Sequence, residues 1–353
     1  MTGPERPQLP RPARLGAALA LSAALLGCSQ DRLPSGPDAV PAGPSAGDEQ
    51  MARSTAPPSP SAPAPVPSPS ASVAPAPDAP ARRVLFEPRR AMADVRHLAG
   101  RIGPRLATAP AFARAGRWVA GRFRGLGYDV RRQGFAVPGG DSWGVPVEPG
   151  RSFNVVATPP DFDPARPHRL VGAHLDTVAV APGAEDNASG VAVMLELARL
   201  AGARSPGQPT VFVAFGAEEP RGTGDALHHF GSTHYVATMS GRQRRALTAM
   251  ASLDRVGVGR GVPVCTGPLS PARVQRAVLR LSGPLGVPAA PCENTASDHW
   301  SFEKAGYPVV RFGSTSYAAY HSEADVPSVV EPAQLGRTGR LAWAWLRTGM
   351  PGR

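Results

Sequence analysis

His174 and Asp176 stand two residues apart at the end of a short apolar stretch, in the sequence LVGAHLD. The stretch is typical of a β-strand, and side chains two residues apart on a strand point to the same face. Ten residues after Asp176, Asp186 precedes an apolar helical run, so its carboxylate would lie at a helix N-terminus. An imidazole and two carboxylates that converge at the carboxyl end of a strand are suited to binding a divalent cation such as zinc.

Further ligand-type side chains follow other apolar runs of the sequence. One run ends just before the pair Glu218 and Glu219, a second ends at Asp254, and His321 lies in a loop after a third. Taken singly, the glutamates could be a solvated loop pair, Asp254 a helix cap and His321 a surface histidine. Their repeated placement at strand ends favours one metal site at one edge of a sheet.

Strand-like and helix-like stretches alternate through residues 82–353. Strands are expected at residues 128–137, 152–158, 169–175, 210–215, 246–253, 262–265 and 307–312. Helices are expected at residues 90–98, 111–126, 187–200, 232–239, 271–281 and 332–348, with a short helix from Asp298. This alternation predicts an α/β fold: a single globular domain with a central mixed, mainly parallel β-sheet and helices on both faces.

The N-terminal 27 residues resemble a bacterial lipoprotein signal peptide. Three arginines precede an apolar run at residues 15–26 that is too short to span a membrane, and Cys28 follows Gly27. An ordinary secretory signal with an incidental cysteine is the alternative. We expect an exported protein of the bacterial cell envelope, anchored to the membrane through a lipid on Cys28.

Residues 28–81 are rich in proline, alanine and serine and contain almost no large apolar side chain. Such a segment cannot bury enough surface to offset the entropy lost on ordering, so a disordered, extended linker is expected. The expected organisation is a signal peptide at residues 1–27, this linker, and one catalytic domain at residues 82–353.

The formal net charge of +11 raises the question of a nucleic-acid partner. Lys304 is the only lysine, and the arginines are scattered without aromatic interleaving or a nucleic-acid motif. We therefore expect no nucleic-acid binding. Attraction of a basic face to an anionic membrane or to acidic peptides stays open.

Cys265 and Cys292 are the two cysteines besides Cys28. A disulfide between them would close a loop of moderate length, and two buried free thiols are the alternative. Zinc ligation is disfavoured, because neither cysteine stands among the acidic residues.

Six short motifs together resemble the co-catalytic zinc aminopeptidase family of clan MH. This family includes bacterial leucyl aminopeptidases, aminopeptidase Y, glutamate carboxypeptidases and glutaminyl cyclases, and the resemblance covers nearly all of the chain after residue 90. It implies a zinc-exopeptidase-like fold. The motifs are AHLD (173–176), EDNASG (185–190), EE (218–219), LD (253–254), SDHW (297–300) and YH (320–321).

The resemblance implies two zinc ions per chain. His174 and Asp254 would bind one ion, Glu219 and His321 the other, and Asp186 would bridge the two. All five are nitrogen or oxygen ligands, which suits a hydrolytic rather than a structural zinc site.

The same resemblance assigns chemical roles to three further residues. Glu218 would be the general base that takes a proton from a water shared by both metals and passes it to the leaving amine. Tyr320 would help the metals stabilise the tetrahedral oxyanion. Asp176 would hydrogen-bond His174 and fix its tautomer.

The expected activity is an aminopeptidase acting on peptides with a free N-terminus. A single-zinc glutaminyl cyclase is the alternative enzyme, and a catalytically inactive peptide-binding scaffold is the alternative outside enzymes. Tyr320 stands where the cyclases tend to have tryptophan, which favours the peptidase. The insertion after the glutamate pair contains His228 and His229, which could edge the substrate pocket, and Arg255 after Asp254 is unusual.

Overall fold

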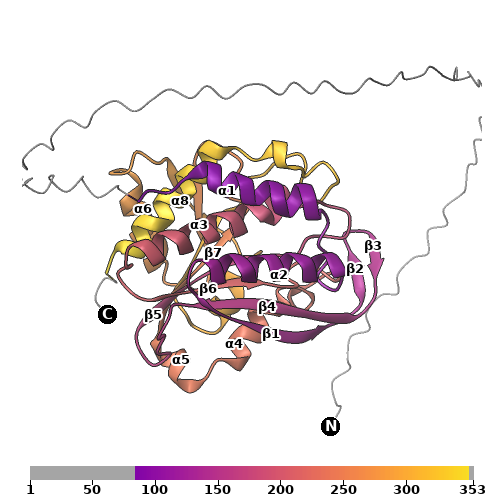
Figure 1. The fold of residues 1–353 in the computed structure, drawn as a ribbon, viewed down its shortest axis with the longest axis horizontal. Helices are drawn as coiled ribbons and strands as arrows, with labels where there is room; N and C mark the ends of the chain where they lie inside the picture. Colours follow the sequence, from indigo (N-terminus) through magenta and orange to yellow (C-terminus); the bar gives the residue numbers. More distant parts are fainter. Residues whose placement is uncertain (1–83, 350–353) are drawn as a thin grey trace, which may run out of the picture. The chain divides into compact units, whose positions relative to one another are not determined.

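The apolar runs of the sequence form one eight-stranded β-sheet with helices against both faces (Figure 1). The computed structural model describes residues 84–349. In sheet order the strands are β1 (Asp129–Val137), β4 (Gly150–Thr158), β6 (Thr210–Phe215), β5 (His168–His174), β7 (Leu247–Asp254), β10 (Val309–Gly313), β8 (Val262–Thr266) and β9 (Ala289–Glu293).

The centre of the sheet is parallel and its margins are mixed. β6, β5, β7 and β10 are parallel neighbours, whereas β4 pairs antiparallel with both β1 and β6, and β8 pairs antiparallel with β10. Every residue of β5 and β6 is buried, as expected for parallel strands covered on both faces. The expected α/β fold with a mixed sheet is confirmed.

Helices cover the two faces in separate layers. One apolar cluster joins α1 (Pro88–Val95), α2 (Pro110–Gly125), α3 (Gly190–Ala203), α6 (Arg273–Ser282) and α8 (Pro332–Arg347) to the sheet. A second cluster on the opposite face includes side chains of α4 (Phe230–Thr238) and α7 (His299–Lys304). α5 (Gly241–Ala246) leads into β7, and four short turns of other helix types are η1 (Arg96–Ile102), η2 (Ala184–Ser189), η3 (Asp225–Leu227) and η4 (Pro327–Val329).

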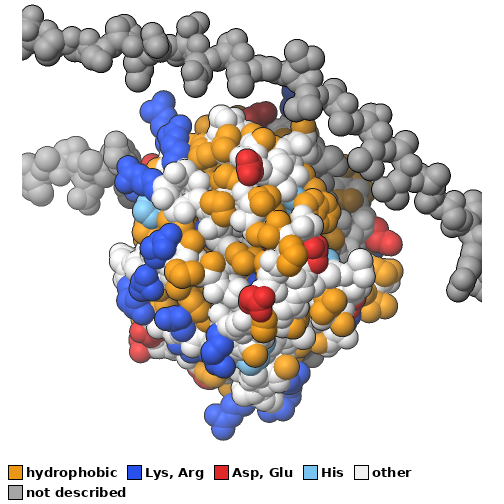
Figure 2. All heavy atoms as spheres, turned by 90° about the vertical axis from the view of Figure 1, so that its right-hand side faces the viewer, with side chains coloured by type: hydrophobic (Ala, Val, Ile, Leu, Met, Phe, Trp, Pro, Cys, Tyr) orange, Lys and Arg blue, Asp and Glu red, His pale blue; other side chains and the backbone are white. Residues whose placement is uncertain are grey.

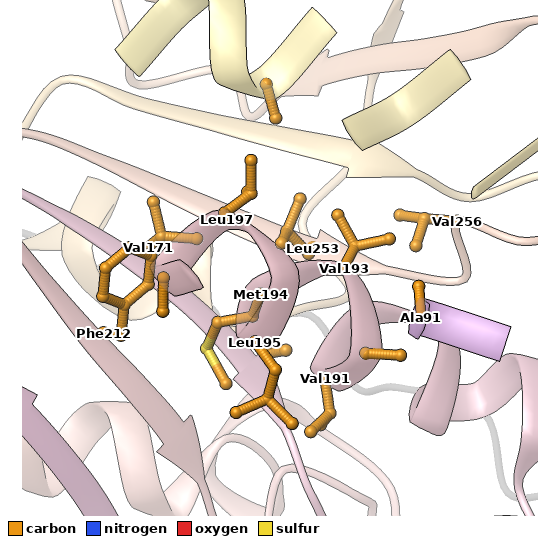
Figure 3. Packing of buried hydrophobic residues seen from close by; sticks show 14 of the residues in the cluster. Ala91, Val171, Val191, Val193, Met194, Leu195, Leu197, Phe212, Leu253 and Val256 are labelled. Atoms are coloured by element: carbon orange, nitrogen blue, oxygen red, sulfur yellow. The ribbon is translucent and has the colours of Figure 1, made fainter. Parts of the chain in front are cut away.

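α3 is the most enclosed helix of the described chain. It lies between the sheet and the outer helices α1 and α8, and ten of its residues are buried. Figure 3 shows Val193 and Leu197 of this helix among side chains from β5, β6 and β7. This enclosure explains why its sequence is apolar apart from the paired Glu196 and Arg199. It also fixes the helix N-terminus at the carboxyl edge of the parallel strands.

Besides the short turns η3 and η4, three features of the described chain were not expected from the sequence. One is α5, and another is the edge strand β9, whose exposed residues lack an apolar run. The third is a two-stranded hairpin of β2 (Gly140–Ser142) and β3 (Val145–Val147). Its connecting residues Trp143 and Gly144 both have positive φ, at 56° and 86°. This is the conformation of a tight type I′ turn, which usually contains asparagine and glycine.

Cys265 and Cys292 lie opposite each other in the parallel register of β8 and β9 and form a disulfide. The structure thus resolves the alternative that the sequence left open. The lipoprotein signal and the linker lie outside the described residues. Among residues 84–349, no helix is long and apolar enough to cross a membrane.

Replacing both Cys265 and Cys292 by serine should lower the free energy of unfolding. The bridge spans 27 residues of sequence, and closing a loop of that length in the unfolded chain corresponds to about 3.5 kcal/mol. Urea unfolding of the double variant against the oxidised wild type measures the difference. Wild-type protein treated with reductant is the control, and an unchanged midpoint in both cases would show that the bridge contributes nothing.

Candidate metal centre

Five buried ligand-type side chains meet at the carboxyl edge of the parallel strands. His174 ends β5, Glu219 follows β6 by four residues, and Asp254 ends β7. Asp186 lies in η2 immediately before α3, and His321 lies in the loop after β10. The site is at this edge because parallel strands end together there, and the preceding apolar runs fix where each strand ends.

The side chains form two sets that share one carboxylate. In the first set, Nε2 of His174 is 3.0 Å from Oδ1 of Asp186 and 3.8 Å from Oδ2 of Asp254. In the second set, Nε2 of His321 is 3.4 Å from Oδ2 of Asp186 and 3.2 Å from Oε2 of Glu219. In each set, one potential ligand atom per residue lies within 4.8 Å of the others. Asp186 therefore presents a different oxygen to each set.

Asp176 orients the site in a different way from the one expected. Its side-chain Oδ1 is 3.9 Å from Nδ1 of His174, and the backbone carbonyl of Asp176 contacts that nitrogen at 3.1 Å instead. The carboxylate accepts hydrogen bonds from the amides of Glu218 and Glu219, both at 3.1 Å. The carboxylate thus holds the glutamate pair, and the carbonyl leaves Nε2 of His174 facing the site.

Asp186 is held in position through its own backbone and its neighbours. The carboxylate of Asp325 accepts hydrogen bonds from the amides of Glu185 and Asp186, at 2.8 and 3.1 Å. The side chain of Asn187 donates to the carbonyl of Leu253 at 2.9 Å, which connects this turn to β7. The peptide bond between Asp186 and Asn187 is cis. Asp325 was not expected from the sequence, because its position in a polar loop gives no periodic signal.

Glu218 lies between two histidines. Its Oε2 is 3.9 Å from Nε2 of His174, and its Oε1 is 3.2 Å from Nε2 of His229. Burial alone would raise the pKa of Glu218, but the neighbouring His174 and His229 outweigh burial and lower it to about 2. His229, from the insertion, therefore contacts Glu218 from inside the site, whereas His228 is bonded to the carbonyl of Gly222 at 3.2 Å.

Asp254 is paired with arginines. Nη2 of Arg311 lies 3.0 Å from its Oδ1, and Nε of Arg255 lies 3.7 Å from the same oxygen. Arg311 is completely buried in β10, where the only sequence signal is a charged residue inside the apolar run VVRFG. Because Arg311 occupies Oδ1, the other oxygen of Asp254 is left to face His174.

Three further residues lie around the ligand-type side chains, and two of them, Tyr320 and Asp298, belong to the sequence motifs. Tyr320 is 38% exposed, and its ring stacks on His321 with 3.7 Å between ring centroids. Trp143, at the tip of the β2–β3 hairpin, stands edge-on to His321 at 4.3 Å. Asp298 is buried with no hydrogen-bond partner for either carboxylate oxygen, and burial, together with the Glu218 carboxylate, raises its pKa to about 8.

The buried ligand-type side chains are better suited to binding a cation than to holding the protons that they carry without a metal. Burial lowers the pKa of both histidines, but nearby carboxylates outweigh it, so the pKa of His174 is well above its usual value and that of His321 is about 10. Burial and the Asp186 carboxylate raise the pKa of Glu219 to about 8. Oε1 of Glu219 is buried without any hydrogen-bond partner. A divalent cation bound by nitrogen and oxygen ligands would compensate this buried charge.

Figure 2 views the side of the described domain that carries the β2–β3 hairpin. Hydrophobic and uncharged atoms dominate this face, acidic side chains are scattered over it, and Lys and Arg gather along one margin. The acidic residues of the candidate centre are buried and therefore do not give this surface an acidic character.

The sequence profile of peptidase family M28 matches residues 154–346, which is more than half of the 353 residues. The chain belongs to peptidase family M28. This membership confirms the family resemblance of the sequence motifs. The match begins at β4 and ends in α8, so it contains all five ligand-type residues.

Individual relatives are similar over parts of the chain. Aminopeptidase YwaD of Bacillus subtilis is 41% identical over 87 residues, which are 25% of this chain and 18% of YwaD. The aligned part of this chain thus spans less than a fifth of that relative. A zinc aminopeptidase structure from Bacillus subtilis has a TM-score of 0.66 at 20% identity, covering 75% of this chain and 95% of that one.

A glutaminyl cyclase from Fimbriiglobus ruber has a similar fold, with a TM-score of 0.60 at 23% identity. The alignment covers 74% of this chain and 95% of the cyclase. At such identities, both structural similarities concern the fold alone. The M28 peptidase chain therefore shares its architecture with aminopeptidases and with a cyclase.

Zinc binding to the metal-free protein should release protons at pH 7. The raised pKa values mean that His174, His321 and Glu219 carry protons at that pH, and each must lose its proton to offer a lone pair. The apparent zinc affinity should therefore rise between pH 6 and pH 9. Calorimetric titration in buffers of different ionisation enthalpy measures the release, and a heat independent of the buffer would contradict it.

Proposed function

We propose that this M28 peptidase is a two-zinc aminopeptidase that removes N-terminal residues from peptides. The observation that carries the proposal is the pair of ligand sets joined through the two oxygens of Asp186. His174 and Asp254 would hold one zinc, and Glu219 and His321 the other. Bound zinc supplies Lewis acidity and lowers the pKa of a water molecule toward neutrality.

Glu218 is the proposed general base. Its Oε2 lies 3.9 Å from Nε2 of His174, and its Oε1 lies 3.2 Å from Nε2 of His229, so the carboxylate is held beside the ligands. The free oxygen accepts the proton of the attacking water and then delivers it to the leaving amine. Asp176 supports this step by holding the backbone amide of Glu218. Tyr320 is proposed to donate a hydrogen bond to the oxyanion from the margin of the site.

Trp143 and Tyr320 form an aromatic wall beside the second ligand set. This wall supports cleavage next to a chain end. Trp143 contacts His321 edge-on, and Tyr320 lies within 5.9 Å of the same tryptophan ring, centroid to centroid. A wall so close to the ligands limits how much of a peptide can continue past the scissile bond. The resemblance to aminopeptidases indicates which end this is, so a peptide with a free N-terminus is the proposed substrate.

The runner-up enzyme is a glutaminyl cyclase with a single zinc ion. The cyclase of similar fold keeps this alternative open. The completeness of both ligand sets favours the peptidase, because a one-zinc enzyme has no need of the second set. The same completeness disfavours an inactive scaffold.

The proposed location is the bacterial cell envelope, with the membrane reached through a lipid on Cys28. The N-terminal sequence supports export, and the disulfide between β8 and β9 is typical of an oxidising compartment. No nucleic-acid partner is proposed.

Replacing Cys28 with alanine in the full chain should move the protein from the membrane fraction to the soluble fraction of a bacterial host, because the anchor is lost. Immunoblotting of the fractions measures the shift. Equal membrane retention of both proteins would refute lipid anchoring at this cysteine.

Glu218→Gln should lower kcat by about a thousandfold, because removing a general base costs typically 10²–10⁴ in rate. The variant should still contain two zinc ions per chain, measured by metal analysis beside the hydrolysis of leucyl nitroanilide. Glu219→Gln is the matched control and should lose zinc, because that carboxylate is a proposed ligand.

The same assay separates the three functions. Two zinc ions with nitroanilide hydrolysis that Glu218→Gln abolishes would support the aminopeptidase. One zinc ion with cyclisation of an N-terminal glutamine peptide and no hydrolysis would establish the cyclase. A protein with no zinc and no turnover would point to the inactive scaffold.

A further inference from the structure

Arg255 stands at the mouth of the metal centre in a fixed backbone conformation. It directly follows Asp254 and has a φ of 55°, in the left-handed region that a non-glycine residue rarely adopts. Its amide donates to Oδ1 of Asn187 at 3.3 Å, and its carbonyl accepts from the amide of Ser314 at 3.3 Å. Both ends of the residue are thus tied to the loops that build the site, so its side chain leaves the backbone in a set direction.

The guanidinium of Arg255 is largely enclosed and yet lacks a close partner. Only 13% of the side chain is exposed. Its Cζ lies 4.6 Å from the centroid of the Tyr320 ring, and its nearest carboxylate, Oδ1 of Asp254, is 3.7 Å from Nε. Within residues 84–349, its side chain makes no contact of hydrogen-bond length. An enclosed arginine normally uses its five donors, so these donors are available to a ligand.

Holding Asp254 in place does not require Arg255. Arg311 already lies 3.0 Å from the same oxygen of Asp254, and its other terminal nitrogen donates to Asn294 and to the carbonyl of Ala296, both at 2.6 Å. Arg311 is completely buried, whereas Arg255 stacks on the partly exposed ring of Tyr320. The two arginines beside Asp254 thus differ in their surroundings: Arg311 is tied to the loop that contains Asn294 and Ala296, and Arg255 lies against the partly exposed Tyr320.

Arg255 shares its only close carboxylate within residues 84–349, that of Asp254, with Arg311, which lies nearer to the same oxygen. Two zinc ions would neutralise the four carboxylates of Asp186, Glu218, Glu219 and Asp254. A guanidinium that makes no hydrogen bond beside such a centre favours an anion, and its planar donors match a carboxylate.

We propose that Arg255 is a substrate-binding residue that gives the site a preference for substrates with a carboxylate close to the scissile bond. Two parts of a short peptide carry such a group: the side chain of an N-terminal glutamate or aspartate, and the terminal carboxylate of a dipeptide. The inference rests on the proposed aminopeptidase function and names its substrate class.

The test compares substrates that differ by one charge, using the zinc-loaded protein. For the side chain, glutamyl and glutaminyl nitroanilides have the same shape. For the terminal carboxylate, leucyl-glycine is compared with leucyl-glycinamide. A charge-assisted hydrogen bond should raise kcat/KM by a factor of about ten or more for the charged member of one pair. The pair that discriminates identifies the source of the carboxylate.

Arg255→Met keeps most of the side-chain length without the charge and should bring the discriminating ratio to about one. Arg255→Glu should reverse it, so that lysyl nitroanilide is preferred to glutaminyl nitroanilide. Arg276→Met, at an exposed arginine of α6, is the control and should keep the wild-type ratio. A merely structural arginine would change the rates for both members of a pair alike.

The outcomes separate this inference from the proposed function. Hydrolysis of leucyl nitroanilide with ratios near one for both pairs would overturn the inference alone. Discrimination that survives in Arg255→Met would overturn it as well, and so would a loss of zinc from that variant, since Arg255 would then act through Asp254. If the wild type cleaves none of these substrates, the aminopeptidase proposal fails, and the inference fails with it.

Discussion

The concentration of buried negative charge around Asp186 is the constraint on which the rest of the site depends. Its two oxygens face two histidines, at 3.0 and 3.4 Å, and three other carboxylates lie in the same pocket. Such a group is costly in a protein interior unless cations compensate it. Without a metal, the histidines take up protons in that role, which is why the pKa of His321 stands near 10. The site is thus prepared electrostatically for divalent cations.

Polar groups of the surrounding chain hold this cluster in place. Asp176 accepts from the amides of the glutamate pair, and Asp325 accepts from the amides of Glu185 and Asp186. Arg105, completely buried, donates to five backbone carbonyls, and among them are those of Leu175, Pro182 and Gly183 in the loop between His174 and Asp186. These contacts fix the backbone on both sides of the proposed ligands, so that the ligand atoms need little reorganisation to bind.

The polar and aromatic side chains around the ligands lie at two depths. Arg311 and His229 lie inside, where they orient Asp254 and Glu218, and Arg255, Tyr320 and Trp143 lie toward the opening. The inner groups set the chemistry that the M28 family membership implies. Among the outer groups, Trp143 and Tyr320 are exposed and the guanidinium of Arg255 makes no hydrogen bond, so substrate preference can be decided there.

The sequence by itself determined the sheet, the ends of its central strands and the five ligand-type residues. Apolar runs fix the length of each strand, and the polar residues that follow each run mark where the strand ends. The sequence did not reveal β9, the hairpin that carries Trp143, or the roles of Asp176, Asp325 and Arg311. Those depend on which backbone amides and carboxylates meet across 40 to 140 residues of chain, as between Asp176 and Glu218 or Asp325 and Glu185. Local patterning carries no record of such contacts, so only the tertiary structure decided them.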